Sequence, residues 1–406
     1  SSCVGCGECV QACPTGAIIE TSLLDKNNDQ TIFPEKKIKS LCPFCGVGCQ
    51  TLVSVKDNKI LTVNGENGPA NENRLCVKGR FGFDYINSPQ RLTAPLIRIS
   101  KKTKSWDISI DDKDIYKYFR KASWEEALDF ASNRFTKILN NYNKNSLAGF
   151  GSAKGSNEEA YIFQKLIRTG FKTNNVDHCT RLCHASSVAA LLQSVGSAAV
   201  SAPFTAVKDS ECIILIGARP EQNHPVAASY FKQAVKNGTK LIILDPRKQS
   251  LSRYATHHLQ FNPGQDLALL NAMIFTIINE NLTNKEYIKN HTEGFEQLEK
   301  EIKKFNPVLM EKLCGIPKEI IREVARIYAK AKTSIIFWGM GISQHVHGTQ
   351  NAFSLINLAL ITGHLGKPGT GLHPLRGQNN VQGASDAGLI PMSYPDYNSV
   401  KIKTNN

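Results

Sequence analysis

The chain has 406 residues, with 49 Lys and Arg against 35 Asp and Glu, and a formal net charge of +14 at pH 7. It is long enough to bury a large core in two or three domains. Its longest apolar runs, Cys212–Ala218 and Ser334–Ile342, have the length of buried strands, so a direct membrane span is not expected. The basic residues are scattered, which disfavours a nucleic-acid partner and suits an anionic cofactor or an acidic partner protein.

Eight of the twelve cysteines lie in the first 76 residues, in two sets. The first set has the spacing Cys-x2-Cys-x2-Cys-x3-Cys-Pro and consists of Cys3, Cys6, Cys9 and Cys13. This spacing is typical of ligands to a 4Fe-4S cluster, and in two-cluster ferredoxins the cysteine before the proline binds the other cluster. We therefore expect a partial ferredoxin-like module whose upstream half is missing. Closure of one cluster by Cys13 is the alternative.

The second set consists of Cys42, Cys45, Cys49 and Cys76. Three of these cysteines lie in one short run, and this pattern also predicts a 4Fe-4S cluster. Zinc sites usually show two separated Cys-x2-Cys pairs, and disulfides need an oxidising compartment. Both alternatives suit this dense spacing less well.

Between the cysteine sets, the polar residues Thr21–Ser40 predict a linker. After Cys49, Thr51–Val55 and Lys59–Val63 alternate between apolar and polar residues like the arms of a β-hairpin, with its turn at residues 57–58. The charged stretch Ser100–Lys121 then separates a small cysteine-ligated domain from the remainder.

From Ser123 onwards, helical and strand patterns alternate, which predicts a parallel sheet with helices on both faces. Ser123 and Ser156 each precede a Glu by three positions and predict two helix starts with capping boxes. Further predicted helices are His224–Asn237, Gln265–Asn281, Pro317–Lys332 and Gly348–Ile361. Predicted strands are Leu147–Gly151, Cys212–Ala218, Leu241–Leu244 and Ser334–Trp338.

The expected fold class is α/β, with parallel-sheet, Rossmann-like cofactor-binding domains preceded by a small 4Fe-4S domain and part of a ferredoxin-like module. We divide the chain into the partial ferredoxin-like module at 1–20, the 4Fe-4S domain at 35–95, a first α/β region at 96–178 that is continued by 379–406, and a second α/β domain at 179–378.

Four loops rich in Gly or polar residues follow predicted strands, where open α/β sheets bind ligands. Glycine lets a phosphate approach the backbone, Asp accepts from ribose or guanine, and Arg pairs with phosphate. One such loop is weak support, but four together predict a large phosphate-bearing cofactor. The candidate residues are Gly217, Arg219, Asp245, Arg247, Gly264, Asp266, Gly339 and Met340. A P-loop motif is absent from the sequence, which disfavours a P-loop ATPase.

Cys183 and His184 form the first candidate reactive centre. A thiolate suits a soft or high-valent metal, and an imidazole exchanges protons near neutral pH. A buried cysteine beside a surface histidine is the simpler alternative, and a cysteine nucleophile is a third.

Arg376, flanked by Gly and amides, offers a fork for a carboxylate, although it also fits a polar loop that caps a helix. Small buried hydrophobic roles are expected for Cys179, Cys212 and Cys314.

Several motifs, in this order along the chain, resemble those of formate dehydrogenase alpha subunits of the molybdopterin oxidoreductase family. They are Cys-Pro-Phe-Cys-Gly-Val-Gly-Cys at 42–49, Cys-Val-Lys-Gly-Arg at 76–80, Arg-Leu-Cys-His at 181–184, Gly-Met-Gly at 339–341 and Leu-Arg-Gly-Gln-Asn-Asn-Val-Gln-Gly at 375–383.

The resemblance implies a molybdenum or tungsten ion held by two pterin guanine dinucleotides, bound within both α/β regions. Cys183 would be the protein ligand to the metal, at a position where family members often carry selenocysteine. His184 would accept a proton or orient its neighbours, and Arg376 would bind the formate carboxylate. Lys78 would lie between the proximal cluster and one pterin. Amides expected near the pterins are Gln344, Gln378 and Asn379.

The implied reaction is oxidation of formate to carbon dioxide, with electrons leaving through the 4Fe-4S clusters to a partner subunit. Our first hypothesis for this partner is a flavin and iron–sulfur module that reduces NAD; ferredoxin, a hydrogenase and a quinone-linked subunit stay open. The alternatives are a nitrate reductase of the same family and a non-catalytic, cluster-bearing subunit of a respiratory complex. The resemblance at His184 and Arg376 favours formate. Reduced thiols favour the cytoplasm, and an export signal upstream stays open.

The chain departs from the family pattern at two places. Arg219 stands where the family usually has Asn before Pro, and its guanidinium would instead pair with a phosphate or stack on guanine. The sequence stops at Asn406, whereas family members continue into more sheet and a C-terminal barrel. We therefore expect a fragment that lacks parts at both ends.

Overall fold

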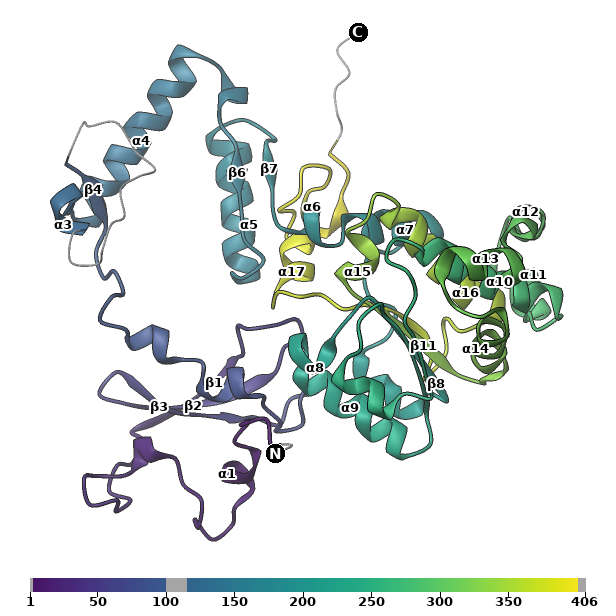
Figure 1. The fold of residues 1–406 in the computed structure, drawn as a ribbon. Helices are drawn as coiled ribbons and strands as arrows, with labels where there is room; N and C mark the ends of the chain where they lie inside the picture. The colour runs from purple at the N-terminus through teal and green to yellow at the C-terminus, as the bar shows by residue number, and fades with distance from the viewer. Residues whose placement is uncertain (1–2, 100–114, 401–406) are drawn as a thin grey trace.

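The computed structural model describes residues 3–99 and 115–400, and Figure 1 shows their arrangement. The cysteine-rich residues form one small body, a five-stranded sheet with its helices forms the largest body, and residues 115–178 extend above both. Most of the charged stretch expected at Ser100–Lys121 lies outside the described residues.

The five-stranded sheet has the order β10-β9-β8-β11-β12, and all neighbouring strands are parallel. Its central strands β8 and β11 are completely buried. After one small residue each, β8 continues as Ile-Ile-Leu-Ile and β11 as Ile-Ile-Phe-Trp, the composition of strands that are covered on both faces. The predicted parallel α/β sheet is therefore confirmed. The strand bounds are β8 Cys212–Ile216, β9 Lys240–Leu244, β10 His257–Leu259, β11 Ser334–Trp338 and β12 Gly371–Pro374.

Helices cover both faces of this sheet because successive side chains of a strand point to opposite sides. Ile214 of β8 joins the apolar core on one face, and Ile213 joins the core on the other. The core that contains Ile213 also includes Cys42, Cys45 and Cys49, so the cysteine-rich domain packs on that side. The helices of the first face are α7 Ala185–Val195, α10 Asp266–Asn279, α14 Lys318–Lys330 and α16 Gly348–Thr362; the second face carries α9 Pro225–Lys236.

The predicted hairpin of the cysteine-rich domain is confirmed. Strands β2 and β3 pair antiparallel, and the turn residues Asp57 and Asn58 have φ of 48° and 57°. Positive φ at both positions is the geometry of the tight turns that join twisted hairpins. A third strand, β1, arises within the expected linker; its six residues are all exposed, so no apolar alternation marked it. The bounds are β1 Lys36–Leu41, β2 Gln50–Lys56 and β3 Lys59–Gly65.

The two predicted capping boxes differ in outcome. The Ser156 hydroxyl accepts from the Glu159 amide, and the Glu159 carboxylate accepts in turn from the Ser156 amide, as expected. The Ser123 hydroxyl accepts from the Glu126 amide, but the Glu126 carboxylate pairs with Arg120 instead of returning to Ser123. The ion pair with Arg120, on the preceding strand, thus replaces the hydrogen bond from the Ser123 amide to Glu126 that would complete the capping box.

Two predicted strands are shorter than expected. Leu147–Gly151 contributes only β6, Gly149–Phe150, which pairs with β7, Val176–Asp177. Strand β8 ends at Ile216 because Gly217 adopts φ of 57°, outside the extended region. The remaining strands are β4 Leu96–Arg98 and β5 Phe119–Lys121.

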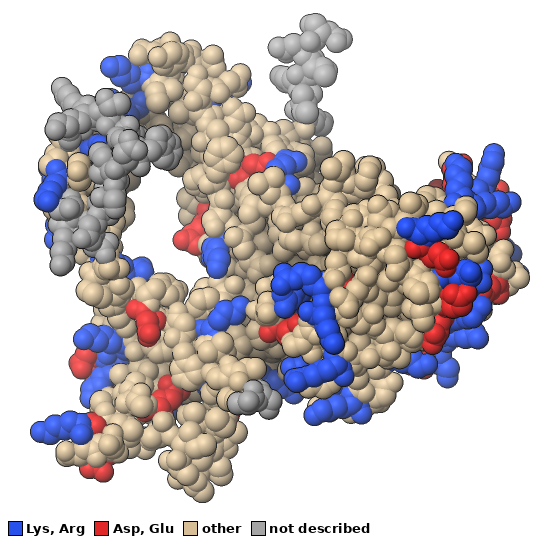
Figure 2. All heavy atoms as spheres, viewed as in Figure 1, with Lys and Arg blue, Asp and Glu red and all other residues tan. Residues whose placement is uncertain are grey.

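The other helices are short or lie outside the large sheet. They are α1 Glu8–Ala12, α2 Val77–Phe81, α3 Ile115–Tyr118, α4 Trp124–Asn141, α5 Asn157–Lys165, α6 Thr180–Cys183, α8 Pro220–Asn223, α11 Lys285–His291, α12 Phe295–Ile302, α13 Pro307–Cys314, α15 Met340–Ser343 and α17 Val381–Asp386. Among the described residues, no helix is both long enough and apolar enough to cross a membrane. On the face shown in Figure 2, Lys and Arg are spread over several elements and interleaved with acidic residues.

Replacing Ile214 by Ala should lower the free energy of unfolding by about 2–5 kcal/mol, because the lost side chain leaves a cavity between fully buried strands. The same change at Ile162, which is 64% exposed on α5, should alter it by about 0.5 kcal/mol or less. Urea unfolding followed by circular dichroism measures both. Equal losses would contradict the placement of β8 in the core.

Candidate functional site

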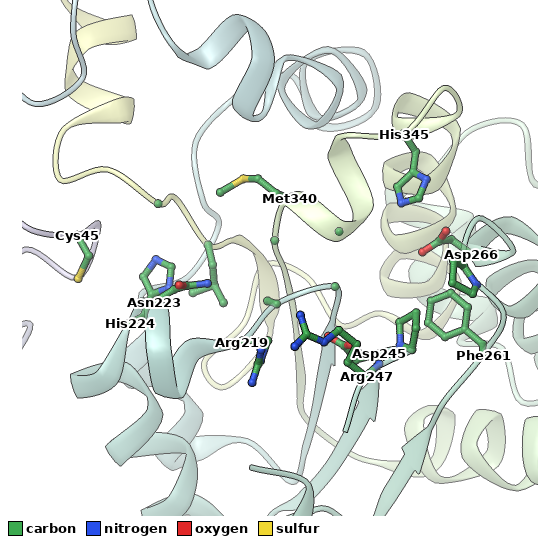
Figure 3. A pocket seen from close by; sticks show the side chains of 18 of the residues that line it. Cys45, Arg219, Asn223, His224, Asp245, Arg247, Phe261, Asp266, Met340 and His345 are labelled. Carbon is green, nitrogen blue, oxygen red and sulfur yellow. Dashed lines mark hydrogen bonds between the residues drawn. The ribbon is translucent and has the colours of Figure 1, made fainter. Parts of the chain in front are cut away.

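A cavity of about 530 Å³ lies at the carboxyl ends of β8, β9 and β11 (Figure 3). The loops that follow these strands form its floor. Among the predicted cofactor residues, its lining contains Lys78, Gly217, Arg219, Asp245, Arg247, Gly264, Asp266, Gly339 and Met340. Residues that the sequence analysis had not singled out also line it, including Phe44, Asn223, His224, Phe261, His345 and Gly377.

The loops after β8 and β11 touch one another at two glycines. The Gly341 amide donates to the Gly217 carbonyl at 3.0 Å. A Cβ atom on Gly217 would lie 2.9 Å from the Gly341 backbone, and Gly217 has a positive φ. Only glycine combines this conformation with this close approach, so the two strand-end loops form one continuous backbone surface beneath the cavity.

Charged side chains gather beside this surface. Figure 3 shows Arg219, Asp245 and Arg247 close together above the strand ends. The Arg247 amide donates to the Asp245 carboxylate at 2.8 Å, and burial raises the pKa of Asp245 above its usual value. Within the described parts of the chain, the buried Nε of Arg219 has no hydrogen-bond partner. An unpaired, buried guanidinium nitrogen that borders a cavity fits an anionic ligand.

The far end of the cavity is formed by Asp266, Phe261 and His345 (Figure 3). Asp266 is only 3% exposed at the start of α10, and burial raises its pKa, while the nearby His345 opposes this shift. A ring and a carboxylate at one end, with guanidinium groups in the middle, suit an elongated ligand that carries both a base and phosphates.

Cys183 ends helix α6 and lies next to the lining of the cavity. Its Sγ is 3.4 Å from the Sδ of Met340, which the cavity touches. Burial raises the pKa of the Cys183 thiol, whereas the Arg376 charge and a hydrogen bond from the Gly377 backbone lower it. The structure thus brings together Cys183 and the loop at Arg376, which are nearly two hundred positions apart in the sequence.

The Arg376 side chain is partly buried, and its Nε atom is fully buried. One of its nitrogens, Nη2, donates to the Ala198 carbonyl at 2.9 Å, whereas its buried Nε has no hydrogen-bond partner among the described residues. Burial is the main cause that lowers the Arg376 pKa, and the nearby Cys183 opposes it. A partly buried cation with a buried, unpaired Nε beside a thiol suits a small anion.

His184 is fully buried, which contradicts the simpler alternative of a surface histidine beside a buried cysteine. Its Nε2 lies 3.2 Å from the Leu375 carbonyl, and its Nδ1 lies 3.3 Å from the Ser187 hydroxyl. Burial lowers its pKa to about 3. The bond to Leu375 fixes the backbone just before Arg376, and the bond to Ser187 holds the ring against helix α7.

Three predicted cofactor residues do not belong to the cavity lining. The Gln344 amide donates to the Leu182 carbonyl at 2.6 Å, and the Asn379 amide donates to the Lys154 carbonyl at 3.3 Å. The Gln378 side-chain oxygen lies 2.5 Å from the Sγ of Cys179.

Of the three cysteines expected to be small buried hydrophobes, Cys212 and Cys314 are fully buried. Cys179 differs from this expectation. It is only partly buried, and its thiol donates a hydrogen bond to the side-chain oxygen of Gln378. It lies one helical turn before Cys183, so the two thiols are neighbours.

The second cysteine set is compact. Cys42, Cys45 and Cys49 are buried, and electrostatic repulsion links each of them to Cys76. Burial, and then the neighbouring thiols, raise the pKa of Cys42 to about 11. In the described residues, no three His, Cys, Asp or Glu side chains converge as closely as one metal ion requires. A cubane cluster binds its four thiolates through four different irons, so its ligands stand further apart.

Lys78 lies between these thiols and the cavity. Its charge lowers the pKa of Cys42 and of Cys45, and it lines the cavity. Its Nζ donates to the Gln222 carbonyl at 3.3 Å. Lys78 is therefore a direct contact between the cysteine-rich domain and the cavity.

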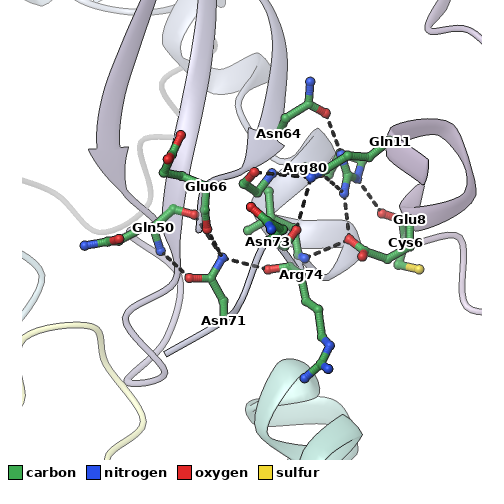
Figure 4. Close-up of polar contacts among 12 residues, drawn as sticks. Cys6, Glu8, Gln11, Gln50, Asn64, Glu66, Asn71, Asn73, Arg74 and Arg80 are labelled. Carbon is green, nitrogen blue, oxygen red and sulfur yellow. Dashed lines mark hydrogen bonds and ion pairs between the residues drawn. The ribbon is translucent and has the colours of Figure 1, made fainter. Parts of the chain in front are cut away.

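The first cysteine set is held by Arg80, whose side chain is completely buried (Figure 4). Its guanidinium donates to the Cys6 carbonyl at 2.8 Å, to Glu8 at 2.6 Å and to Gln11 at 2.9 Å. A further bond reaches the Asn64 side chain at 2.7 Å. Because most of its partners come from residues 6–11, Arg80 fixes that segment on the cysteine-rich domain.

The thiols of the first set are more accessible than those of the second: Cys3 and Cys9 are exposed, and Cys6 and Cys13 are partly exposed. A hydrogen bond with Thr15, followed by one from the Ile18 backbone, lowers the pKa of Cys13 to about 7. Stabilisation of the thiolate is what a cluster ligand requires.

The geometry defines an α/β protein with a cavity that suits an anionic ligand, a thiol beside it and two cysteine sets. Residues 91–406 match the molybdopterin oxidoreductase family, residues 35–88 match the molybdopterin oxidoreductase Fe4S4 domain, and residues 1–19 match the 4Fe-4S binding domain. The chain therefore belongs to the molybdopterin oxidoreductase family.

Similar proteins include the F420-dependent formate dehydrogenase subunit alpha of Methanocaldococcus jannaschii, with 41% identity over 90% of this chain and 51% of the relative. Formate dehydrogenase H of Escherichia coli is 39% identical over 91% of this chain and 50% of the relative. The chain thus spans about half the length of these curated relatives. The solved structure of acetylene hydratase from Pelobacter acetylenicus shares the fold, with a TM-score of 0.71 and 24% identity over 81% of this chain and 43% of that one.

Replacing Arg80 by Met should release residues 6–11 from the cysteine-rich domain, because each hydrogen bond to a charged group contributes about 1.5–3 kcal/mol. The amides of Gly65 and Leu75, which donate to Gln11 and Glu8, should exchange hydrogen at least about tenfold faster. Hydrogen exchange with mass spectrometry measures this. The control is Arg74→Met, since Arg74 is half-exposed, and its guanidinium contacts Glu72 at 3.6 Å and the Tyr230 ring. Equal protection in both variants would contradict the anchoring role of Arg80.

Proposed function

We propose that this chain is the catalytic part of a formate dehydrogenase, which oxidises formate to carbon dioxide and passes two electrons through 4Fe-4S clusters to a partner subunit. The observation that carries this proposal is the Arg376 guanidinium beside the Cys183 thiol, with a buried Nε that has no hydrogen-bond partner among the described residues. The relatives named as formate dehydrogenases support the same substrate.

The residues present fit a pterin dinucleotide cofactor. The unmet buried Nε of Arg219 and the backbone surface at Gly217 and Gly341 provide a cradle for phosphate groups. Asp266 and Phe261 offer a partner for a guanine base at the far end. We propose the guanine dinucleotide form for this reason, with Cys183 as the ligand of a molybdenum or tungsten ion. When bound, this group supplies the acceptor for the two electrons of formate.

The chain's own residues would bind and orient the substrate. Arg376 would hold the formate carboxylate through its unmet donor and so fix the direction of the C–H bond. We propose that His184 orients the Leu375–Arg376 backbone, because both of its nitrogens already hold partners. Lys78 would lie between the cofactor and the cluster bound by Cys42, Cys45, Cys49 and Cys76.

Electrons would leave through the cluster at Cys3, Cys6, Cys9 and Cys13, which Arg80 holds against the cysteine-rich domain. We propose a flavin and iron–sulfur partner that reduces NAD, and a cytoplasmic location. The F420-dependent relatives suggest F420 as a second acceptor to test. The domain division at 35–95, 96–178 with 379–406, and 179–378 is part of the same proposal.

The complete protein, purified without oxygen, should contain molybdenum or tungsten and should reduce a viologen dye in the presence of formate. Cys183→Ala should abolish this reduction while leaving the electron paramagnetic resonance signals of the clusters unchanged, because the thiol lies outside both cysteine sets. Cys314→Ala removes a fully buried core thiol and should keep activity. Absence of both metals together with no formate-dependent reduction would refute the proposal; nitrate reduction instead would support the nitrate reductase alternative.

Arg376→Lys should raise the KM for formate by about tenfold or more, because a point charge replaces a planar fork and hydrogen bonds to charged groups contribute about 1.5–3 kcal/mol. Steady-state dye reduction measures the change. Arg181→Lys serves as the control, since Arg181 lies on the same helix as Cys183 but pairs with Asp177 at a half-exposed position. An unchanged KM in Arg376→Lys would remove this arginine from the formate site.

A further inference from the structure

His224 lies at the junction of α8 and α9, on the wall of the cavity, and is only 5% exposed. Its backbone is fixed on both sides: its amide donates to the Pro220 carbonyl at 2.8 Å, and its carbonyl accepts from the Ala228 amide at 3.0 Å. Pro225 follows directly and restricts the His224 backbone further. The imidazole therefore projects from a rigid base.

The His224 Nε2 lies 2.6 Å from the main-chain carbonyl of Arg376. A carbonyl can only accept, so this ring nitrogen carries the proton and donates. Burial lowers the pKa of His224, which favours the neutral ring. The bond thus joins a helix junction to a loop that lies 152 positions later in the sequence.

The same carbonyl rests on the loop of the second cysteine set. A Cβ atom on Gly46 would lie 2.3 Å from the Arg376 carbonyl oxygen. Gly46 follows Cys45 directly, so the cysteine loop closes one side of this carbonyl while His224 holds the other. No side chain larger than hydrogen fits at residue 46 unless the Arg376 backbone moves.

The carbonyl one residue earlier has a similar anchor, since the Nε2 of His184 lies 3.2 Å from the Leu375 oxygen. Two buried histidines from different elements thus hold two consecutive peptide groups. The Leu375 amide adds a third bond, to the Trp338 carbonyl of β11 at 2.7 Å. The direction in which the Arg376 side chain leaves the backbone is set by these bonds.

We propose that His224 is a positioning residue for Arg376, which acts by fixing the Arg376 carbonyl against Gly46 of the cysteine loop. The proposal rests on the proposed function, since Arg376 is there the group that binds the carboxylate. It adds a residue that touches neither formate nor the reacting atoms but sets the geometry of the one that binds formate.

The test compares His224→Leu with His224→Gln in the complete protein. Loss of the bond in His224→Leu should raise the KM for formate about tenfold with a smaller change in kcat, because one buried hydrogen bond contributes about 1–3 kcal/mol when its acceptor is left unpaired. A glutamine amide reaches to nearly the same place as Nε2, so His224→Gln should return the KM close to the wild-type value. Gly46→Ala, which displaces the same carbonyl from the opposite side, should raise the KM in the same way.

His364→Leu is the matched control. His364 is also buried and also bonds through Nε2 to a main-chain carbonyl, that of Tyr328 at 3.2 Å, but it lies away from the cavity lining. This variant should lose stability without any change in the KM. An unchanged KM in His224→Leu, an equal rise in His364→Leu, or no recovery in His224→Gln would overturn the proposal.

Hydrogen exchange of residues 375–383 gives a readout that needs no turnover. His224→Leu should increase exchange in this segment, and His224→Gln should not. If the wild-type protein shows no formate-dependent reduction, the proposed function fails while this exchange still decides whether His224 anchors the loop. Unchanged exchange in His224→Leu would overturn the positioning role whatever the substrate.

Discussion

Burial of the parallel sheet on both faces is the constraint on which the rest of this structure depends. Strands β8 and β11 contain no exposed residue, so the polar loops that join them to helices must lie at the sheet edges. Because these strands are parallel, the loops after β8, β9 and β11 all lie at the same edge of the sheet. The contact between Gly217 and Gly341 shows how tightly this edge is packed, and the cavity lies directly above it.

The cysteine-rich domain packs against the same sheet. Its buried thiols share an apolar core with Ile213 and Phe337 of the sheet as well as with Val63 of the hairpin, so the large sheet helps to position the second cysteine set. From the same domain, Lys78 lines the cavity and Gly46 lies against the Arg376 backbone. The proposed electron route therefore depends on the same apolar contacts that hold the domains together.

Two arginines show how a structural cation differs from a candidate ligand-binding one. Arg80 is completely buried, and its guanidinium donates to four partners within the protein, which suits a residue that joins two segments. Arg376 is partly buried, and its buried Nε has no hydrogen-bond partner among the described residues. Because an unpaired buried donor costs free energy, such an atom is best explained by a ligand that completes it.

The sequence by itself determined the elements whose formation depends on near neighbours. The bounds of Ser334–Trp338 agree with β11, and the box at Ser156 and Glu159 formed as expected, because strand burial and helix capping act within a few residues. The cysteine spacing and the family motifs likewise pointed to the family that the matches establish. Only the tertiary structure decided the rest. The strand β1 is fully exposed, so no apolar pattern predicted it. The Glu126 carboxylate pairs with Arg120 instead of with the Ser123 amide. The burial of His184 and the bond from His224 to Arg376 join residues far apart in the chain, and such contacts depend on how the sheet and its helices pack, which local patterns do not encode.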